Sequence, residues 1–482
     1  MPFVAGVDSS TQSTKVEIRD LDTGEVVGRG AAAHPAVTAP VSEQDPGSWW
    51  SAFELAWEQA SLQLPARVGS GEISAISVGG QQHGMVALDA QDQPLYPAKL
   101  WNDTESAPDA EWLRGQLASG HGDGATEWAD ATGSVPVAAF TVTKLRWLRR
   151  TKFGLWDRLA HVLLPHDYLT HRLTRSYTTD RGDASGTGYW SPITGEYRWD
   201  ILALIDADRD WSQVVPTVLG PLDIAGTWNG MTVAPGTGDN MAAALGVGLR
   251  PGDAVISVGT SGTAYSVSDV PTADASGAVA GFADATGRYL PLVCTSNAAK
   301  VLDAMARLLG VDHDEFDRLA LQVEASEGAQ SAGPTLLPYF DGERTPNRPD
   351  AAGVLAGLRS DISREQFARA AVDGVACGLL DAFEALRALA PVSGKLLLTG
   401  GGARSIALQG VLNGLVDIPV ALADADEAVA TGAAVQAAAV LEQTDHSIIQ
   451  ERWGLGAGTS VDIIVEPGDL WERYAALRDD RA

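Results

Sequence analysis

The sequence contains the same short design twice: an apolar strand, a turn rich in hydroxyl side chains, and a second strand. The first copy spans residues 3–19 around the turn Asp8–Lys15, and the second spans residues 253–267 around the turn Gly259–Thr263. Residues 15–19 alternate with a period of two, which is typical of a half-buried strand. A third strand is expected from residue 25, so the chain opens as an antiparallel meander. A repeat spaced about 250 residues apart is too long for a solenoid, and it favours a duplicated domain.

The rest of the chain alternates between helix and strand patterns, which indicates the α/β class. Helices are expected at 45–63, 142–150, 241–248 and 406–416, strands at 73–78 and 396–398, and loops at 181–200 and 226–240. We place the boundary between the copies at about 242–252, near Pro251-Gly252. The expected domains are residues 1–246 and 247–442, followed by a tail, 443–482, that packs on the core.

Composition narrows the classes of function. The formal net charge is −28, and a surface this acidic argues against nucleic acid and anionic membranes as partners. The two cysteines, Cys294 and Cys377, are too few and too far apart for a disulfide framework. The N-terminus lacks the basic region of a signal peptide, and no apolar run is long enough to span a membrane. A cytoplasmic location is therefore expected.

The turn Asp8–Lys15 is the first candidate site. Small hydroxyl residues in a tight turn can present N–H and O–H donors to phosphate oxygens. Asp8, at the end of its strand, could hold a metal-bound water, because Mg²⁺ favours one or two carboxylates together with phosphate oxygens. The turn is not a P-loop, since the G-x-x-x-x-G-K-[ST] pattern is absent and a strand follows. The alternative is an ordinary polar hairpin turn.

Two further candidates lie in the second half. The turn Gly259–Thr263 has the same donor chemistry as the first, with a hairpin turn as its alternative. Gly400–Ser405 follows an apolar strand and precedes a predicted helix, and its three glycines would let a flat ring or a phosphate approach the backbone closely. Its alternative is a tight turn between a strand and a helix.

The remaining candidates are polar residues near predicted strand and helix ends. Asp239 precedes a helix rich in small residues and could be a general base or a helix N-cap; spacing does not separate these roles. Gln82 and His83 follow the strand 73–78 and offer hydrogen bonds suited to sugar hydroxyls, although a lone histidine is usually structural. No histidine has the spacing of a metal ligand.

The order of these segments along the chain resembles that of the FGGY family of carbohydrate kinases. The resemblance covers residues 4 to about 440, and the segments at its sugar site are similar to those of the family's xylulokinases. The matching segments are Asp8–Lys15, Ser42–Pro46 with Trp49-Trp50, Gln81–Gly84, Leu100–Asp103, Leu164–Leu169, Asp183–Thr187, Gly238–Asn240, Ser257–Thr263, Leu337–Pro346 and Gly400–Ser405.

This resemblance implies two ribonuclease-H-like domains of the actin/hexokinase type flanking a catalytic cleft, with ATP and Mg²⁺ required. It implies that Asp239 is the general base and that Asp8 organises Mg²⁺, through water, and the phosphates. Gln82, His83, Asp239 and Asn240 would bind the sugar. The ATP-binding residues would be Ser10, Thr11, Gln12, Lys15, Thr260, Gly401, Gly402 and Ala403.

The expected reaction is transfer of the γ-phosphoryl group of ATP to the 5-hydroxyl of D-xylulose. The sequence departs from the family pattern at Ser10, where glycine is often found, at Gln82, where xylulokinases often have methionine, and at Ala139, where some relatives have a larger side chain. These changes bear on which sugar is preferred. The alternatives are a kinase for another ketopentose, a hexulose, a polyol or glycerol, and a non-catalytic, actin-like nucleotide-binding regulator. The family also allows a homodimer.

Overall fold

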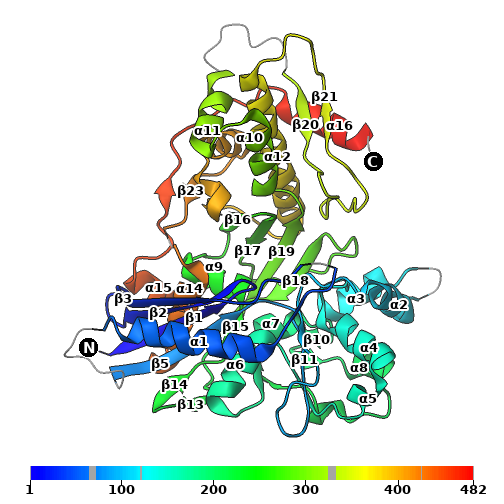
Figure 1. The fold of residues 1–482 in the computed structure, drawn as a ribbon, viewed down its shortest axis with the longest axis vertical. Coiled ribbons are helices and arrows are strands. Elements are labelled where there is room, and N and C mark those ends of the chain that lie inside the picture. The colour runs from blue at the N-terminus through cyan, green and yellow to red at the C-terminus, as the bar shows by residue number, and fades with distance from the viewer. Residues whose placement is uncertain are drawn as a thin grey trace. The chain divides into compact units, whose positions relative to one another are not determined.

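The computed structural model describes residues 2–38, 40–64, 72–119, 122–323, 333–424 and 426–480 (Figure 1). The chain forms two compact units. The first comprises Met1–Leu249, Asp269–Leu290 and Ala425–Ala457, and the second comprises Arg250–Ser268, Pro291–Asp424 and Gly458–Ala482. The units are therefore discontinuous in the chain, unlike the continuous ranges 1–246, 247–442 and 443–482 that we expected from the sequence.

The sheet of the first unit starts as an antiparallel meander of β1 (Phe3–Ser9), β2 (Ser13–Asp20) and β3 (Val26–Ala33). β5 (Ile73–Gly80) then pairs parallel to β1, and β14 (Met231–Val233) pairs parallel to β5. The order is β13-β14-β5-β1-β2-β3. The predicted meander is confirmed.

The sheet of the second unit repeats this arrangement. β16 (Ala254–Val258), β17 (Gly262–Ser266) and β19 (Tyr289–Thr295) are antiparallel neighbours. β22 (Leu396–Thr399) pairs parallel to β16, and β23 (Val420–Leu422) pairs parallel to β22. Three antiparallel strands followed by two parallel ones thus occur in both units. This confirms the prediction of two α/β domains with a common fold.

Helices cover both faces of the first sheet. α1 (Pro46–Ser61) packs on β2 and β3, and α14 (Ala428–Glu442) packs on β1 and β5. α9 (Asp239–Gly246) packs on α14 so closely that a Cβ at Gly432 would lie 1.7 Å from the carbonyl oxygen of Ala242. This backbone contact fixes the axis of α9, and with it the position of Asp239 at its N-terminus.

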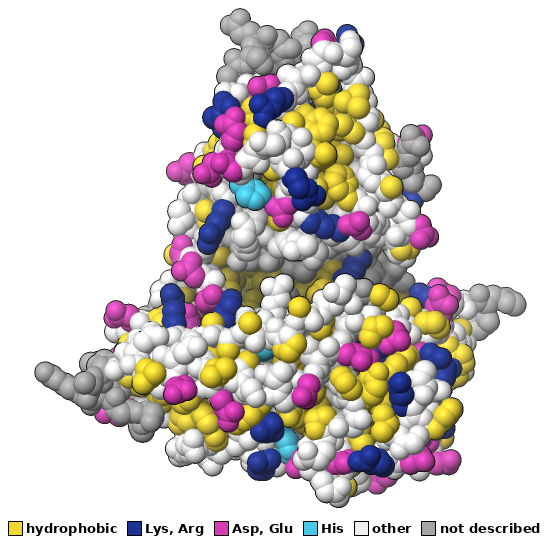
Figure 2. Space-filling view, viewed as in Figure 1, with side chains coloured by type: hydrophobic (Ala, Val, Ile, Leu, Met, Phe, Trp, Pro, Cys, Tyr) yellow, Lys and Arg dark blue, Asp and Glu magenta, His cyan; other side chains and the backbone are white. Residues whose placement is uncertain are grey.

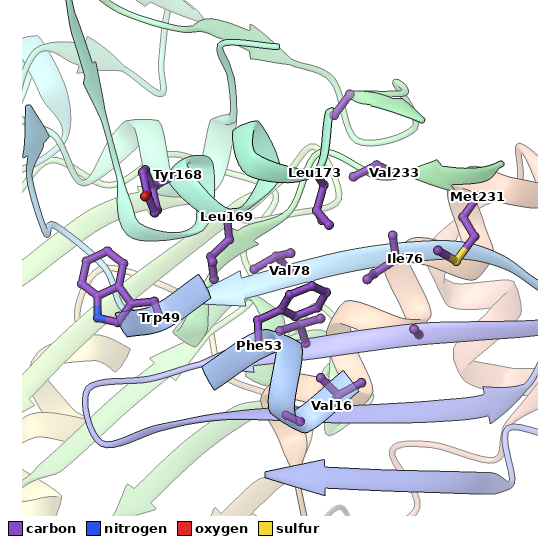
Figure 3. Close-up of a cluster of buried hydrophobic side chains, with 14 of the residues drawn as sticks. Val16, Trp49, Phe53, Ile76, Val78, Tyr168, Leu169, Leu173, Met231 and Val233 are labelled. Carbon is purple, nitrogen blue, oxygen red and sulfur yellow. The ribbon is translucent and has the colours of Figure 1, made fainter. Parts of the chain in front are cut away.

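The core of the first unit lies between α1 and the sheet. Asp45 caps α1 by accepting a hydrogen bond from the amide of Gly47, and Pro46 begins the helix, where its missing N–H costs nothing. The apolar face of α1 then buries Trp49 and Phe53 against strand side chains and α6 (Pro165–Thr174) (Figure 3). The labelled members of this cluster are Val16, Trp49, Phe53, Ile76, Val78, Tyr168, Leu169, Leu173, Met231 and Val233.

In the second unit, α12 (Arg364–Arg387) packs against β17 and three further helices, α10 (Ala299–Leu309), α11 (His313–Gln322) and α13 (Ile406–Leu415). The last residues of the chain are shared between the units. α15 (His446–Arg452) packs with α14 in the first unit, and α16 (Leu470–Asp480) packs with α12 in the second.

The segments expected to be loops, 181–200 and 226–240, contain short elements instead: α7 (Arg181–Ser185), β10 (Trp190–Ser191), β11 (Glu196–Tyr197), the start of α8 (Trp199–Ile205), β13 (Gly226–Trp228), β14, β15 (Thr237–Gly238) and the start of α9. Asp180 explains α7, because its carboxylate accepts hydrogen bonds from the amides of Gly182 and Asp183. Aspartate and glycine, read as loop residues, here cap and join short elements.

The remaining elements are β4 (Glu43–Gln44), β6 (Val86–Leu88), β7 (Ala98–Lys99), α2 (Ala107–Leu117), α3 (Ala125–Thr132), α4 (Thr141–Thr151), α5 (Phe153–Trp156), β8 (His161–Leu163), β9 (Thr178–Asp180), the 3₁₀ turns η2 (Trp211–Gln213) and η4 (Gly401–Arg404), β12 (Thr217–Leu219), β18 (Val279–Ala283), β20 (Thr335–Leu337), β21 (Val354–Ala356) and β24 (Thr459–Ser460).

Acidic and basic side chains are interspersed on the described part of the face drawn in Figure 2. Among the described residues, no helix combines the length and the apolar character that crossing a membrane requires. Neither Cys294 nor Cys377 forms a disulfide.

Candidate functional site

The hairpin turn of the first unit is built around a buried carboxylate. Asp8 is the penultimate residue of β1 and is only 4% exposed. The Ser10 hydroxyl donates a hydrogen bond to it, and Lys15 is its partner across the hairpin. Burial raises the pKa of Asp8 to about 6, although Ser10 and Lys15 act in the opposite direction. The Lys15 ammonium lies 2.5 Å from a carboxylate oxygen of Glu427, so it already has an anionic partner.

Side chains from three other segments form hydrogen bonds with Thr11 in this turn. The Thr11 hydroxyl donates to Gln81 Oε1 at 3.0 Å and accepts from Trp101 Nε1 at 3.0 Å. The Gln44 side chain donates to the Thr11 carbonyl, also at 3.0 Å. Gln12 is exposed at the tip of the turn. The turn is therefore held in one conformation by side chains that the sequence places far away.

Asp239 is the first residue of α9, and Gly238 is the N-cap. The structure therefore does not give Asp239 the N-cap position that was the alternative to a catalytic role. Its Oδ1 accepts from both the backbone amide (2.8 Å) and the side-chain amide (2.9 Å) of Asn240. The Asn240 side chain also donates to Gln82 Oε1 at 2.8 Å. Asp239, Asn240 and Gln82 thus form one hydrogen-bonded group.

The electrostatic surroundings of Asp239 disfavour its charge. Burial raises the pKa of Asp239 to about 7, and the negative charges of Asp8 and Asp183 act in the same direction. A carboxyl group with a pKa near neutrality can accept a proton and release it again at physiological pH.

A buried histidine, His166, contacts both the segment before Gln82 and the segment before Asp239. His166, near the start of α6, is enclosed by Asp167, Asp180 and Asp183, with closest nitrogen–oxygen distances of 3.0, 3.8 and 2.7 Å. All four side chains are buried. A Cβ at Gly80, the last residue of β5, or at Gly236 would lie within 3 Å of His166 atoms. The backbone at both positions therefore packs directly against His166.

Two of the three carboxylates interact with residues that adjoin the group formed by Asp239, Asn240 and Gln82. The Asp180 side chain accepts from the Thr237 hydroxyl at 2.7 Å, and the backbone amide of His83 acts to lower the pKa of Asp183. Burial alone would lower the pKa of His166, but the three negative charges raise it to about 9. Burial raises the pKa values of all three aspartates, and that of Asp167 reaches about 7. A protonated His166 therefore holds together carboxylates that would otherwise repel one another.

Sequence reasoning gave no role to His166, Asp180 or Asp183. Two of them fall in the segments Leu164–Leu169 and Asp183–Thr187, which resemble family motifs, so motif position was the only available signal. A buried charge network is formed by residues from several elements, and spacing along the chain does not reveal it.

The candidate residues of the second unit form a separate set. Thr260 lies exposed in the turn between β16 and β17, and η4 follows β22, which is the parallel neighbour of β16. Parallel neighbours end at the same edge of a sheet, so these two turns are adjacent; a Cβ at Gly402 would lie 2.6 Å from a Val258 side-chain atom. Gly401 is exposed, and Ala403 is buried at 4% exposure.

The structure thus gathers the predicted residues into two groups. Within the first unit it brings the sugar-site candidates close to Asp8 and the first turn, and within the second it brings the second turn next to the glycine-rich segment. The first group is Asp8, Ser10, Thr11, Gln12, Lys15, Gln82, His83, Asp239 and Asn240, and the second is Thr260, Gly401, Gly402 and Ala403.

One other cluster of described acidic residues has the spacing of a metal site. Oxygen atoms of Glu43, Asp103 and Glu105 converge near one point, but the Lys99 ammonium lies 2.9, 2.9 and 2.6 Å from them. The lysine supplies the positive charge that a metal ion would bring, so this cluster is a buried ion-pair network.

Comparison with known proteins agrees with this architecture. Residues 3–246 match the N-terminal domain of the FGGY family of carbohydrate kinases, and residues 254–441 match the C-terminal domain. A xylulose kinase of Streptomyces coelicolor is 45% identical over 491 aligned positions, covering all of this chain and 97% of the relative. The crystal structure of a xylulose kinase from Bifidobacterium adolescentis is 40% identical, with a TM-score of 0.85 and 99% coverage of both chains.

A more distant structure shows the fold alone. Plasmodium falciparum glycerol kinase, solved with ADP, is 17% identical and superimposes with a TM-score of 0.84 over the whole of this chain and 98% of that chain. Together with the two matched domain models, these similarities show that the chain belongs to the FGGY family of carbohydrate kinases and is an ATP-dependent sugar kinase.

Proposed function

We propose that this kinase transfers the γ-phosphoryl group of ATP to the 5-hydroxyl of D-xylulose, with Asp239 as the general base. The relatives of 45% and 40% identity are named xylulose kinases, which supports this choice of sugar. The observation that carries the mechanism is the hydrogen-bonded group of Asp239, Asn240 and Gln82, whose carboxyl group has a pKa near neutrality.

Asp239 accepts the proton of the attacking hydroxyl. Both hydrogen bonds from Asn240 go to Oδ1, so Oδ2 is the oxygen that we assign to the proton. Phosphoryl transfer needs little covalent help from the protein, and most of the rate enhancement comes from positioning and charge stabilisation. Asn240 and Gln82 hold the carboxylate in place and, with His83, offer hydrogen bonds to the remaining sugar hydroxyls.

Asp8 suits an indirect role with Mg²⁺. A magnesium ion in such a site keeps several waters and takes few protein ligands, and Asp8 is a buried carboxylate that retains one oxygen apart from the Ser10 hydrogen bond at Oδ1. The ion would neutralise charge on the phosphates when bound. Asp8 itself would orient a metal-bound water and hold the Ser10 hydroxyl.

The residues that we propose for ATP binding belong to both of the groups defined above. The Ser10 and Thr11 backbone, with exposed Gln12, would donate to phosphate oxygens, while Lys15 would do so only by sharing its charge with Glu427. In the second unit, Thr260 offers an exposed hydroxyl, exposed Gly401 and half-buried Gly402 admit the adenosine, and buried Ala403 can contribute only its backbone. A homodimer and a cytoplasmic location remain predictions.

The test is ADP release from ATP with Mg²⁺ in the presence of D-xylulose, ribulose, fructose, arabitol or glycerol. We expect the highest kcat/KM with D-xylulose. A clear preference for another sugar in the panel would reject the substrate while keeping the kinase chemistry.

A further inference from the structure

The His83 side chain lies in an aromatic enclosure inside the first unit. Its ring centroid lies 4.9 Å from that of Phe140, nearly perpendicular to it, and 5.4 Å from that of Phe282. The two phenylalanines also contact each other, with centroids 6.2 Å apart. On a further side, a Cβ at Gly186 would lie 2.5 Å from the His83 ring, so only glycine leaves room for it.

The backbone of His83 adds a second constraint. Its φ is +64°, a left-handed conformation that side chains other than glycine rarely adopt. The Thr141 hydroxyl donates a hydrogen bond to the His83 carbonyl at 3.3 Å. Backbone and ring are thus fixed independently, which is typical of a side chain whose orientation matters for function.

Hydrogen bonds from two side chains fix the backbone at and before Phe140. The buried Lys144 ammonium donates to the carbonyls of Ala138 and Ala139, and the Thr143 hydroxyl donates to the carbonyl of Phe140 at 2.7 Å. Phe140 itself is 5% exposed. This wall of the enclosure is preorganised.

Phe282 comes from β18, a segment that follows the second hairpin in sequence but belongs to the first unit. Its neighbours are anchored there: the Gly281 amide donates to the Gly133 carbonyl at 2.9 Å, and the Ala283 amide donates to the Ser185 hydroxyl at 2.9 Å. Ser185 adjoins Gly186, so the strand that supplies Phe282 is fixed to the segment that forms another wall. Phe282 is 2% exposed.

We propose that Phe282 is a positioning and specificity-determining residue, which confines the His83 ring and thereby determines how tightly the sugar binds. This inference rests on the proposed role of His83 in sugar binding. Loss of one aromatic contact of this kind changes a binding or conformational equilibrium constant by about 2- to 12-fold. A smaller side chain at position 282 would let the His83 ring turn away, so the sugar would bind less well while ATP binding would stay the same.

The experiment compares Phe282→Leu with the matched control Phe53→Leu. Phe53 is also 2% exposed but lies in the core between α1 and the sheet, away from His83. After thermal melting has verified folding, we expect Phe282→Leu to raise the KM for sugar about 3- to 10-fold without changing the KM for ATP. Phe53→Leu should lower the melting temperature and leave both KM values unchanged.

A double-mutant cycle with His83→Gln tests whether Phe282 acts through His83. In that background, Phe282→Leu should have no further effect on the sugar KM. An undiminished effect there, an equal change in the KM for ATP, or the same change in Phe53→Leu would overturn the proposal. If Phe282→Leu does not fold, Phe140→Leu removes the opposite wall and should give the same sugar-selective increase.

The sugar used for these measurements is the best substrate of the wild-type enzyme in the panel above. If that sugar is not D-xylulose, the proposed substrate fails, yet the role of Phe282 is still tested with the sugar that the enzyme accepts. If D-xylulose is the substrate and Phe282→Leu leaves its KM unchanged, the inference about Phe282 fails alone.

Discussion

The turn after β1 and the turn after β16 join equivalent strands, yet they carry different side chains. The first contains the buried Asp8, with Ser10 bonded to it and Lys15 paired across the hairpin. The second has no acidic residue between Ser257 and Thr263, and its Thr260 and Ser261 are exposed. Equivalent positions in the two sheets therefore support charged chemistry in one unit, and hydroxyl and backbone donors in the other.

The difference extends to the surroundings of each turn. In the first unit, a carboxyl group with a pKa near neutrality and a buried histidine with three aspartates lie close to the sugar-site residues. In the second unit, the neighbouring segment is glycine-rich and uncharged from Gly400 to Ala403. We therefore expect substitutions in the first unit to affect the chemical step and pH dependence, and substitutions in the second to affect nucleotide affinity.

The largest effect is expected for Asp239→Asn. Removing the proposed general base should lower kcat about 10²- to 10⁴-fold, because no other group in the hydrogen-bonded set can accept the proton. ADP release measures turnover, and calorimetric titration with ATP measures binding, which should be unchanged. Near-native turnover would show that Asp239 is not the base and would remove the main contrast between the units.

His166→Asn should reduce the free energy of unfolding by about 3–5 kcal/mol, because it leaves buried carboxylates without their cation. Those carboxylates would stay protonated in the folded variant, so their pKa values would be raised above the unfolded values. Unfolded aspartates ionise near pH 4, so the stability of the variant should fall as pH rises from about 4 towards the raised pKa values, as urea unfolding can measure.

The matched control for that variant is His446→Asn. His446 is also buried in the first unit, but burial lowers its pKa, so it is neutral. It should cost less stability and, because it keeps the His166 cluster, its stability should follow the pH dependence of the wild-type protein above about pH 7. Equal losses for the two variants would mean that His166 contributes by packing and not by charge.

Asp8→Asn should weaken the apparent affinity for Mg²⁺ by about 10- to 100-fold, the usual effect of losing a group that orients a metal-bound water. Titrating Mg²⁺ at fixed ATP and sugar measures this. Thr260→Ala, in the equivalent turn, is the control and should leave the Mg²⁺ dependence unchanged. An effect of similar size in both variants would contradict the chemical asymmetry of the two turns.

The pH profile of kcat/KM provides a further contrast. Since Asp239 must be ionised to act and its pKa is about 7, activity should fall about tenfold per pH unit well below pH 7. The charge of Asp8 contributes to that raised pKa, so Asp8→Asn should move the acid limb to lower pH. An acid limb that stays in place, or moves to higher pH, would show that the charge of Asp8 does not raise the pKa of Asp239.

The smallest effect is expected for Thr260→Ala. Loss of one hydroxyl hydrogen bond, at an exposed position where water can replace it, should raise the KM for ATP about 2- to 10-fold and leave the KM for sugar unchanged. Initial rates over a range of ATP concentrations measure it. A selective loss of sugar affinity would assign Thr260 to the other substrate.

Much of the fold follows from local patterns. The alternation in residues 15–19 predicted a strand and the apolar face with Trp49 and Phe53 predicted a helix, because a period of two or 3.6 reports directly which face is buried. The duplication was predicted from the strand, turn and strand that occur twice. Asp8 and Asp239 were identified because each follows or precedes a recognisable element.

The parts that sequence reasoning missed depend on long-range contacts. His166 acquires its role only when α6, α7 and two loops converge on it, and Phe282 reaches His83 through a strand about 200 residues further along the chain. Short elements such as α7 were missed because aspartate and glycine serve equally well in loops and as caps.

The discontinuous first unit has a consequence for how the protein is made. The face of β1 and β5 that α14 covers consists of small, closely packed residues; a Cβ at Gly6 would lie 1.9 Å from the carbonyl oxygen of Ala430. A ribosome synthesises α14 only after more than 400 residues, so the nascent first sheet lacks its own covering helix until then. The first unit can therefore complete its folding only after α14 has been translated.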